Sequence, residues 1–477
     1  MAQANVEQFY PAEGGINTYE NPIVSDGVLI HAVNVTSPTY GVKAKRYGYS
    51  TFLGTPDSSP VTSLFDFQNI RNSGTALNLY RASGTKLYYS LQGTGAWTTA
   101  GNGTISNGAH FGHAILGTVL IGGDAIGSTR HTTNGTSFTN TILAPKSEFF
   151  EQYQNRIYAL GTASDSFYST TNDATNWNTS GTSDSSSIKI PGAGKLMQPI
   201  KVADRLVHPK TSGIMYKWDG YSLIDMATNY GPSSSYSIAG VEGYKFFLNN
   251  LGLYGFGGDM PKLLSNAIQY QFYNSRNTGV QGTTFSTIPA VAHRYDYLAT
   301  VGTITDSFTS RTISDAIIKY DYQKNEFLNW QFANKPTAYL SYRDTSGSQQ
   351  LIFGDSVGQV YKMDSSTTDN GNPIACEMVY FFTGKMPHVE KQWRWWRGFF
   401  NPGCEAIVQV ACSNVFSYEN LIWSDVGDCS SGFVEYRFDN PKNNRGRFLF
   451  VRIYENSKNS QMIFYGQEHS FIPNPVW

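Results

Sequence analysis

The sequence predicts an all-β protein: a β-propeller of about seven blades, with an extended N-terminal arm before it and a β-sandwich after it. Seven strand-and-turn units recur between residues 62 and 370, and strand residues near their turns lie 41, 39, 48, 38, 66 and 41 positions apart. These strand residues are Tyr88, Thr129, Tyr168, Tyr216, Tyr254, Tyr320 and Tyr361. A blade of four short strands takes about 40 to 45 residues and buries its faces only against neighbouring blades. The period therefore predicts radially stacked blades, with an insertion at 266–285 in the longest gap.

The composition is typical of short strands joined by tight turns. The chain has 46 Gly, 31 Tyr and 29 Phe in 477 residues, and only 15% of its residues are charged. Aromatic residues favour strands, and glycine favours turns. No run keeps apolar residues at helical spacing over three turns, and 261–270 is the best helical candidate. We therefore expect almost no helix.

The charge balance limits the partners that the chain can bind. A formal net charge of −1 argues against a free nucleic-acid binder, whose affinity would depend on many phosphate contacts. Any contact with DNA must therefore be local. The first residues lack the basic and apolar regions of a signal peptide, and no apolar run of 18 residues occurs. We expect neither conventional export nor a membrane-spanning segment.

Residues 1–55 differ in residue pattern from the repeats that follow. Gly and Pro interrupt this segment, which predicts an extended arm with one or two short strands. The arm ends in a basic cluster formed by Lys43, Lys45 and Arg46. Such a cluster can be a solvated strand edge that discourages sheet-to-sheet pairing, or it can contact DNA or an acidic partner. We treat these three residues as a candidate interface.

Residues 56–372 form the predicted propeller, and three of its turns share one chemistry. In 90–97, 133–138 and 171–177, a polar turn rich in Gly, Asn or Asp precedes an aromatic residue. Gly and Asn accept positive φ, Asp and Asn side chains bind nearby backbone amides, and the ring covers the hairpin. The turns look like weakened forms of the Asp-box of sialidase-type propellers, without its full motif. We interpret them as architectural.

Residues 373–477 have longer strands, in a length that suits a β-sandwich of about seven strands. Their densest aromatic cluster is 393–400, where strand alternation would place Trp393, Trp395 and Phe399 on one face and Trp396 and Phe400 on the other. Trp and Arg together are typical of binding hot spots, although core packing would also produce this pattern. The candidate interface here is Trp393, Arg394, Trp396 and Arg397.

The four cysteines also lie in the C-terminal region, without a Cys-x-x-Cys pair. They are Cys376, Cys404, Cys412 and Cys429. Zinc sites use more closely spaced pairs, so we expect buried free thiols.

The sequence contains no recognisable catalytic constellation. It has no Gly-x-Ser-x-Gly elbow, and 192–196 lacks the residues of a phosphate-binding loop. His110 and His113, three apart on an expected strand, should point to opposite faces and not share a metal. The propeller carboxylates and arginines are dispersed: Asp165, Asp173, Asp184, Asp219, Asp225, Arg81, Arg130, Arg156 and Arg205. We expect no catalytic residue, cofactor or metal site, and predict that the protein is not an enzyme.

Short motifs in the N-terminal arm resemble the opening of the tail hub, or DNA-stabilisation, proteins of short-tailed bacteriophages and of related nozzle proteins. The motifs are Gly14-Gly15-Ile16-Asn17, Asn21-Pro22, Ala32-Val33-Asn34-Val35 and Lys45-Arg46-Tyr47-Gly48. The stretches 175–177 and 371–374 look like the propeller and terminal sandwich of the same family. The resemblance therefore extends over nearly the whole chain.

This resemblance implies a structural virion protein, assembled in the bacterial cytoplasm, that forms a ring at the distal end of the tail. Such a ring, usually a hexamer, lies below the portal and adaptor proteins and closes the DNA exit channel. The implied partners are further copies of the chain, the portal or adaptor protein, a tail needle, spikes or fibres, and the genomic DNA. The alternative is a carbohydrate-binding or sialidase-like propeller that recognises a host receptor.

Overall fold

The computed structural model describes residues 6–18, 26–54, 57–69, 76–91, 93–160, 164–180, 183–241, 243–272, 287–306, 309–439 and 444–474. In these ranges the regular secondary structure is almost entirely β-strand. The two helical segments are short 3₁₀ turns, η1 (Ser235–Ser237) and η2 (Ser265–Gln271). Within the described part, no helix has the length and apolarity needed to cross a membrane. The all-β expectation is confirmed, and the predicted helical stretch 261–270 is partly the 3₁₀ turn η2.

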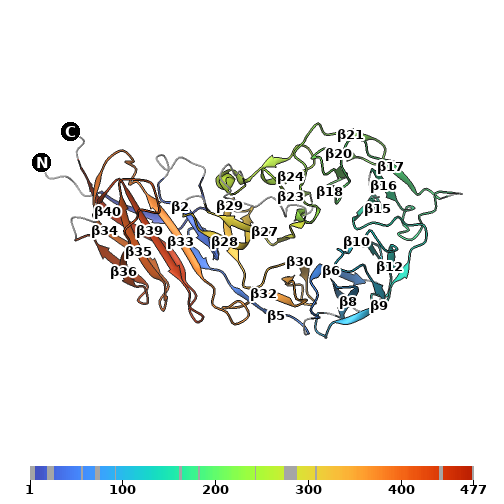
Figure 1. Ribbon diagram of the computed structural model, residues 1–477, viewed down its shortest axis with the longest axis horizontal. Coiled ribbons are helices and arrows are strands. Elements are labelled where there is room, and N and C mark those ends of the chain that lie inside the picture. The colour runs from blue at the N-terminus through green and yellow to red at the C-terminus, as the bar shows by residue number, and fades with distance from the viewer. Residues whose placement is uncertain are drawn as a thin grey trace.

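Within the described residues, six separate four-stranded antiparallel sheets are arranged around an axis, which identifies a β-propeller (Figure 1). Five consist of strands consecutive in the chain. They are β6 (Val61–Asn69), β7 (Ala76–Ser83), β8 (Lys86–Leu91) and β9 (Thr98–Thr104); β10 (Gly112–Leu116), β11 (Val119–Gly123), β12 (Arg130–Thr132) and β13 (Thr139–Asn140); β14 (Phe150–Tyr153), β15 (Arg156–Leu160), β16 (Asp165–Tyr168) and β17 (Ser186–Lys189); β18 (Ile200–Val202), β19 (Arg205–Pro209), β20 (Met215–Trp218) and β21 (Leu223–Asp225); and β22 (Ala239–Val241), β23 (Tyr244–Asn249), β24 (Gly252–Phe256) and β25 (Lys262–Leu263).

The sixth separate sheet closes the ring with a strand from the N-terminal arm. It consists of β30 (Ala338–Arg343), β31 (Gln349–Gly354), β32 (Val360–Ser366) and β5 (Gly48–Thr51). Tyr361 pairs with Thr51, and Met363 pairs with Tyr49. The ring is therefore completed by strands that lie far apart in the sequence.

The remaining four strands of the repeat region do not form a separate blade. They are β26 (Ala290–His293), β27 (Asp296–Thr305), β28 (Thr312–Asp321) and β29 (Glu326–Gln331), and they form one end of a nine-stranded sheet. The sheet continues because β2 (Val28–Val33) pairs in parallel with β29, through Val33 and Asn329. The prediction of seven blades is corrected accordingly: six blades are separate, and these four strands are shared with the C-terminal region.

The repeat positions in the sequence nevertheless correspond to equivalent places in the structure. Tyr88, Tyr168, Tyr216, Tyr254, Tyr320 and Tyr361 lie in the third strand of their four-strand units, and Thr129 directly precedes such a strand. The predicted insertion at 266–285 begins with η2, and most of it lies outside the described residues.

Two sheets make up the C-terminal region. The nine-stranded sheet continues from β2 into β33 (Cys376–Phe382), β39 (Phe448–Glu455), β35 (Ile407–Ser413) and β36 (Ser424–Asp428). The other sheet has seven strands: β1 (Val6–Pro11), β3 (Val35–Thr36), β4 (Lys43–Lys45), β34 (Lys391–Phe400), β37 (Phe433–Arg437), β38 (Arg445–Gly446) and β40 (Ile463–Pro473). Both sheets contribute to one hydrophobic core.

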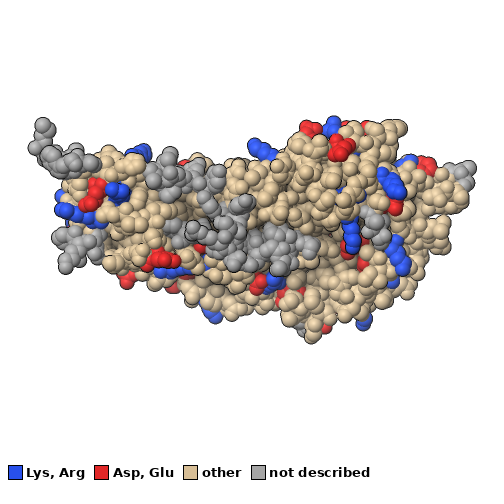
Figure 2. Space-filling model, turned by 45° about the horizontal axis from the view of Figure 1, so that its top comes forward, with Lys and Arg blue, Asp and Glu red and all other residues tan. Residues whose placement is uncertain are grey.

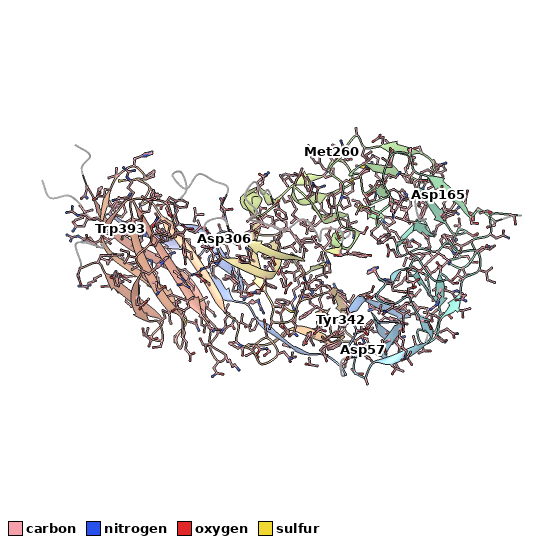
Figure 3. The ribbon with its side chains drawn as sticks, viewed as in Figure 1. Asp57, Asp165, Met260, Asp306, Tyr342 and Trp393 are labelled. Carbon is pink, nitrogen blue, oxygen red and sulfur yellow. The ribbon has the colours of Figure 1, made fainter. Side chains whose placement is uncertain are left out.

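The N-terminal arm is therefore not a separate unit before the propeller. β1 pairs with β40, β2 lies between β29 and β33, and β5 completes a propeller blade. The predicted C-terminal sandwich is likewise not a separate unit of residues 373–477, because four arm strands belong to its two sheets. Figure 3 shows the extent of the molecule: Trp393 lies among the C-terminal sheets, and Asp165 lies at the opposite side of the propeller ring.

Candidate functional site

The basic cluster of the arm lies in the protein interior, which corrects its prediction as an exposed interface. Lys43, Lys45 and Arg46 are each at most 1% exposed. Each side chain meets one buried carboxylate: Lys43 Nζ lies 3.0 Å from Glu326, Lys45 Nζ lies 3.3 Å from Glu455, and Arg46 Nη2 lies 2.6 Å from Asp369. Sequence could not identify these pairs, because the partners lie hundreds of residues away. These cations cannot line a DNA channel in the folded subunit.

Arg46 is the centre of a polar junction between the propeller and the C-terminal region. Its guanidinium binds both carboxylate oxygens of Asp369, at 2.8 and 2.6 Å. It also donates to the side chain of Asn34 and to the backbone carbonyl of Gln331. Asn34, at a φ of 58°, in turn donates to the carbonyl of Ala375. The segment between the last propeller strand and β33 is thus fixed by the arm.

The arm motifs that lie within the described residues all contribute to the junction between the propeller and the C-terminal region. Gly15 packs so closely on β29 that a Cβ atom would lie 2.5 Å from the backbone nitrogen of Phe327. A Cβ atom on Gly48 would lie 2.0 Å from the carbonyl oxygen of Thr368. Real Cβ atoms do not approach backbone this closely, so both positions require glycine. Asn21 and Pro22 lie outside the described residues.

The tryptophan-rich strand β34 also differs from its prediction. Trp393 and Trp396 are both completely buried, whereas simple alternation would place them on opposite faces. The reason is an irregularity in the pairing with β40: Trp393 faces Phe471, but Trp395 already faces Ser470. One extra residue reverses the side-chain parity after Arg394. Trp393 and Trp396 are therefore core residues and not interface residues.

The outer face of the same sheet carries a group of aromatic side chains, two of them exposed. Phe399 lies between Phe9, at 6.2 Å, and Phe433, at 5.7 Å, measured between ring centroids. Phe9 is 56% exposed and Phe433 is 43% exposed. Arg397 stacks on Trp395 and forms an ion pair with Glu435. Sequence analysis found Arg397 but missed Phe9 and Phe433, which only strand pairing brings beside it.

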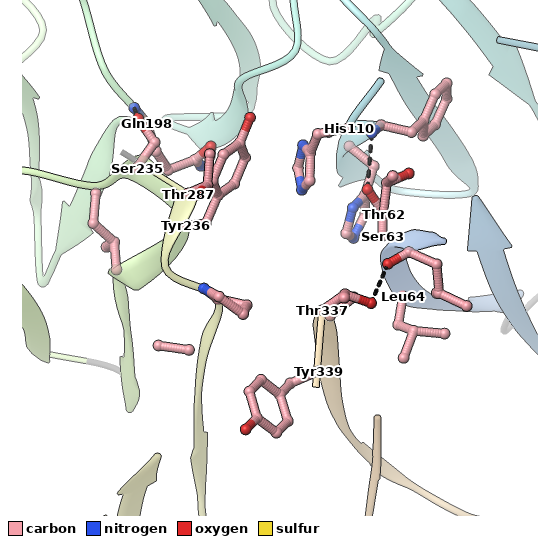
Figure 4. Close-up of a pocket in the computed structure, with 18 of the residues that line it drawn as sticks. Thr62, Ser63, Leu64, His110, Gln198, Ser235, Tyr236, Thr287, Thr337 and Tyr339 are labelled. Atoms are coloured by element: carbon pink, nitrogen blue, oxygen red, sulfur yellow. Dashed lines mark hydrogen bonds between the residues drawn. The ribbon is translucent and has the colours of Figure 1, made fainter. Parts of the chain in front are cut away.

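A pocket of about 590 Å³ lies on the propeller axis (Figure 4). Most of its lining residues lie in or just before the first strand of a four-strand unit, among them Thr62, His110, Gln198, Tyr236 and Thr337. Hydrogen bonds between neighbouring units frame this wall. The hydroxyl of Thr62 donates to the carbonyl of Ala109, and that of Thr337 donates to the carbonyl of Val61.

His110 and His113 both line this pocket, contrary to the expectation that they point to opposite faces. Strand β10 begins only at Gly112, so His110 precedes it and strand alternation does not apply. Burial lowers the pKa of His110 to about 3 and that of His113 to about 4, so both imidazoles are neutral at pH 7. Among the described residues, no cluster of three metal-binding side chains occurs.

The dispersed arginines and carboxylates do not meet in this pocket. Arg81 forms an ion pair with Asp57, Arg156 with Asp184, and Arg205 with Asp204 and Asp259. None of the four arginines or five aspartates singled out from the sequence is among the lining residues. The sialidase-like alternative therefore lacks its arginine cluster in the pocket.

The aromatic turns have the geometry expected of hairpin caps. The side chain of Asn134 accepts hydrogen bonds from the amides of Thr136 and Ser137, and Asp173 accepts one from the amide of Thr175. The following rings, Phe138 and Trp177, are buried. These contacts agree with an architectural role.

The charged side chains on the face seen in Figure 2 lie in small mixed groups, without a broad basic area. This agrees with the net charge of −1.

No protein-family model and no curated protein sequence matches the chain. Solved structures share a propeller with it at low similarity. BamB from Moraxella catarrhalis is 11% identical with a TM-score of 0.39, over 76% of this chain and 98% of its own. YCF48 from Cyanidioschyzon merolae is 10% identical with a TM-score of 0.41, over 66% and 98%. The Pan2 WD40 domain of Neurospora crassa is 8% identical with a TM-score of 0.41, over 67% and 94%. At these values the similarity carries no argument about function.

Proposed function

We propose that this protein is a structural component of a bacteriophage tail, which forms a ring at the distal end of the portal and adaptor channel. The observation that carries the proposal is the location of the motifs that resemble tail hub proteins. Gly15, Asn34, Arg46 and Gly48 all lie at the joint between the propeller and the C-terminal sheets. The resemblance therefore concerns residues that determine the architecture of the whole subunit.

The structure of this junction suits a subunit that must keep a fixed shape under mechanical force. A continuous nine-stranded sheet runs through both parts, and three buried ion pairs attach the arm to both. Buried charge pairs specify one arrangement, because each charge is costly to bury without its partner. A ring that closes a DNA channel and docks a needle, spikes or fibres requires such a fixed shape.

The C-terminal sheets are proposed to form a β-sandwich that offers its outer face to neighbouring subunits. The rings of Tyr380 and Phe464 lie 5.8 Å apart and belong to different sheets, and this contact supports face-to-face packing of the two sheets. On the outer face, Phe9, Phe399 and Phe433 provide apolar area beside the Arg397 and Glu435 ion pair. Exposed aromatic residues with arginine are typical of protein interfaces.

Loss of the protein from the phage that encodes it tests this proposal. Particles assembled without the chain should package DNA and then lose it, and immunogold particles against the chain should mark the tail tip of the wild type. DNA-filled, infectious particles that lack the chain would contradict the proposal. The alternative, a receptor-binding propeller, predicts DNA-filled particles that fail to adsorb, and the axial pocket is the observation in its favour.

A further inference from the structure

The seven-stranded sheet has two outer strands, β1 and β37, that each pair with one neighbour among the described residues. Val6–Pro11 of β1 pair with β40, and Phe433–Arg437 of β37 pair with β34. The second edge of each strand therefore presents backbone N–H and C=O groups that no described strand uses. Such an edge is a template for a further strand. Figure 1 shows β34 and β40, which lie between these two strands, at the end of the molecule away from the propeller ring.

The directions of the strands make the two edges complementary. β1, β40, β34 and β37 are neighbours in this order, and each neighbouring pair is antiparallel. β37 therefore runs in the direction opposite to β1. If a second copy lies beside the first with its strands in the same directions, β37 of one copy and β1 of the next form an antiparallel pair. The alternating pattern of the sheet then continues from one copy into the next.

The register within the sheet determines which residues would meet at such a seam. Three rows of outward-facing residues cross the four strands: Glu7, Ser470, Trp395 and Arg437; Phe9, Glu468, Arg397 and Glu435; and Pro11, Gly466, Phe399 and Phe433. Each row starts on β1 and ends on β37. Continuation of the rows into a second copy places Arg437 opposite Glu7, Glu435 opposite Phe9, and Phe433 opposite Pro11.

The first row ends in opposite charges. The side chain of Arg437 is 71% exposed at one edge, and Glu7 is exposed at the other. Glu435 on the same strand accepts a hydrogen bond from Arg437, and Asp439 is also near it, so the β37 edge has no positive excess. The match depends instead on position, because Glu435 also pairs with Arg397 further inside the sheet, whereas Arg437 ends its row. Opposite charges at directly opposed positions of two strands attract each other.

The other two rows add apolar area to the same seam. Phe433 is exposed at one edge and Phe9 at the other. Across the seam these two rings occupy diagonal positions, which are within reach of aromatic side chains. Pro11 has no N–H group and ends β1, so the pairing stops there. The contact would remove both exposed rings from water, which is favourable.

We propose that the free edge of β37 pairs with β1 of a second copy of this chain, antiparallel and in the register that places Arg437 opposite Glu7. The contact joins two different surfaces, so it is head-to-tail, and successive contacts of this kind close into a ring where the rotation between copies permits. This inference specifies how subunits of the proposed tail ring join, and it rests on that function in taking a further copy as the partner. Immunogold marking of the tail tip does not require this contact, so failure of the contact alone would leave that marking unchanged.

Sedimentation velocity of the full chain over a range of concentrations tests the inference. The wild type should form species larger than a dimer, because a head-to-tail contact leaves a free edge at each end until a ring closes. Glu7→Arg and Arg437→Glu should each weaken association by about tenfold, because each places like charges opposite each other. Arg343→Glu is the control, since Arg343 is exposed on β30 of the propeller. A wild type that stays monomeric at every concentration, or association that is equal in all three variants, would overturn the inference.

A mixture of the two charge variants distinguishes this contact from a two-fold contact between like edges. The Glu7→Arg chain has a cation at both row ends, and the Arg437→Glu chain has an anion at both. Alternating copies therefore place opposite charges at every seam, and the mixture should form the large species that neither variant forms alone. A mixture that forms nothing larger than a dimer would contradict the head-to-tail contact.

Hydrogen exchange of the unmodified chain avoids dependence on the folding of these variants. The backbone amides of β1 and β37 should exchange more slowly in concentrated, associated samples than in dilute, monomeric ones. β21, the outermost strand of a propeller blade, is the internal control, and its exchange should not change. Equal exchange of β1 and β37 in both samples would also overturn the inference.

Discussion

Replacement of Arg46 by Met tests whether the arm holds the two parts of the molecule together. The guanidinium is 1% exposed and contributes two hydrogen bonds to Asp369, one to Asn34 and one to Gln331. Removal of one partner from a buried ion pair costs about 3 to 5 kcal/mol, because the other charge remains buried and unpaired. The variant should therefore be markedly less stable.

The expected change in melting temperature follows from the length of the chain. Unfolding entropy is about 2.1 cal/mol/K per residue near 60 °C, or about 1 kcal/mol/K for 477 residues. Since one sheet runs through both parts, we expect one main transition, and Arg46→Met should lower its midpoint by about 3 to 5 °C. Scanning calorimetry measures this shift directly.

Two companion variants make the test specific. Arg205→Met removes a partly exposed arginine whose partners, Asp204 and Asp259, are almost fully exposed, and should change the midpoint by less than about 1 °C. Arg46→Met combined with Asp369→Leu removes both buried charges and should recover at least half of the loss. A shift for Arg46→Met no larger than that of the Arg205 control would refute the account of the junction.

Three further predictions concern the pH dependence, the thiols and the glycines. Burial lowers the pKa of His208 to about 3, so its neutral form stabilises the fold fully above the unfolded value near 6.5, and this contribution is lost as the pH falls from there toward 3; the melting temperature of His208→Leu should fall less between pH 7 and pH 4 than that of the wild type, and an identical slope would contradict this. The four cysteines are free, and burial raises the pKa of Cys404 to about 11 and that of Cys429 to about 12. Ellman's reagent should therefore react slowly with the native chain, whereas in guanidinium it should react with all four thiols. Four rapidly reacting thiols in the native chain would be inconsistent with this burial. Gly48→Ala places a Cβ atom against the carbonyl of Thr368 and should lower the yield of folded protein, whereas Gly95→Ala, with nothing within 4 Å, should not; equal behaviour of the two variants would argue against close packing at Gly48.

The sequence predicted the repeats because the features that carry them are local. Each repeat position marks a third strand, and each aromatic turn forms its hydrogen bonds within a few residues. The sequence also predicted buried free thiols, and three of the four are buried, whereas Cys412 is partly buried. The sharing of four strands with the C-terminal region was not predictable, because it depends on one parallel contact between Val33 and Asn329.

The prediction of the candidate interface was wrong at residues whose exposure depends on contacts with distant parts of the chain. A run of Lys43, Lys45 and Arg46 has the pattern of a solvated edge, and only the fold brings carboxylates from positions 326, 369 and 455 to them. A single irregularity at Arg394 similarly reversed the faces of β34. Charge reversal at Lys43 and Arg46 would therefore unfold the subunit, and it cannot serve as a probe of tail assembly.

A reconstruction of the tail of the encoding phage by electron cryomicroscopy tests the central claim most directly. The proposal predicts a closed ring at the distal end of the portal and adaptor channel, into which copies of this 52.8 kDa chain fit, six of them if the resemblance to tail hubs extends to symmetry. The outer face that carries Phe9, Phe399 and Phe433 should be covered by a neighbouring subunit. A tail tip whose density accommodates no copy of this chain would contradict the proposed function.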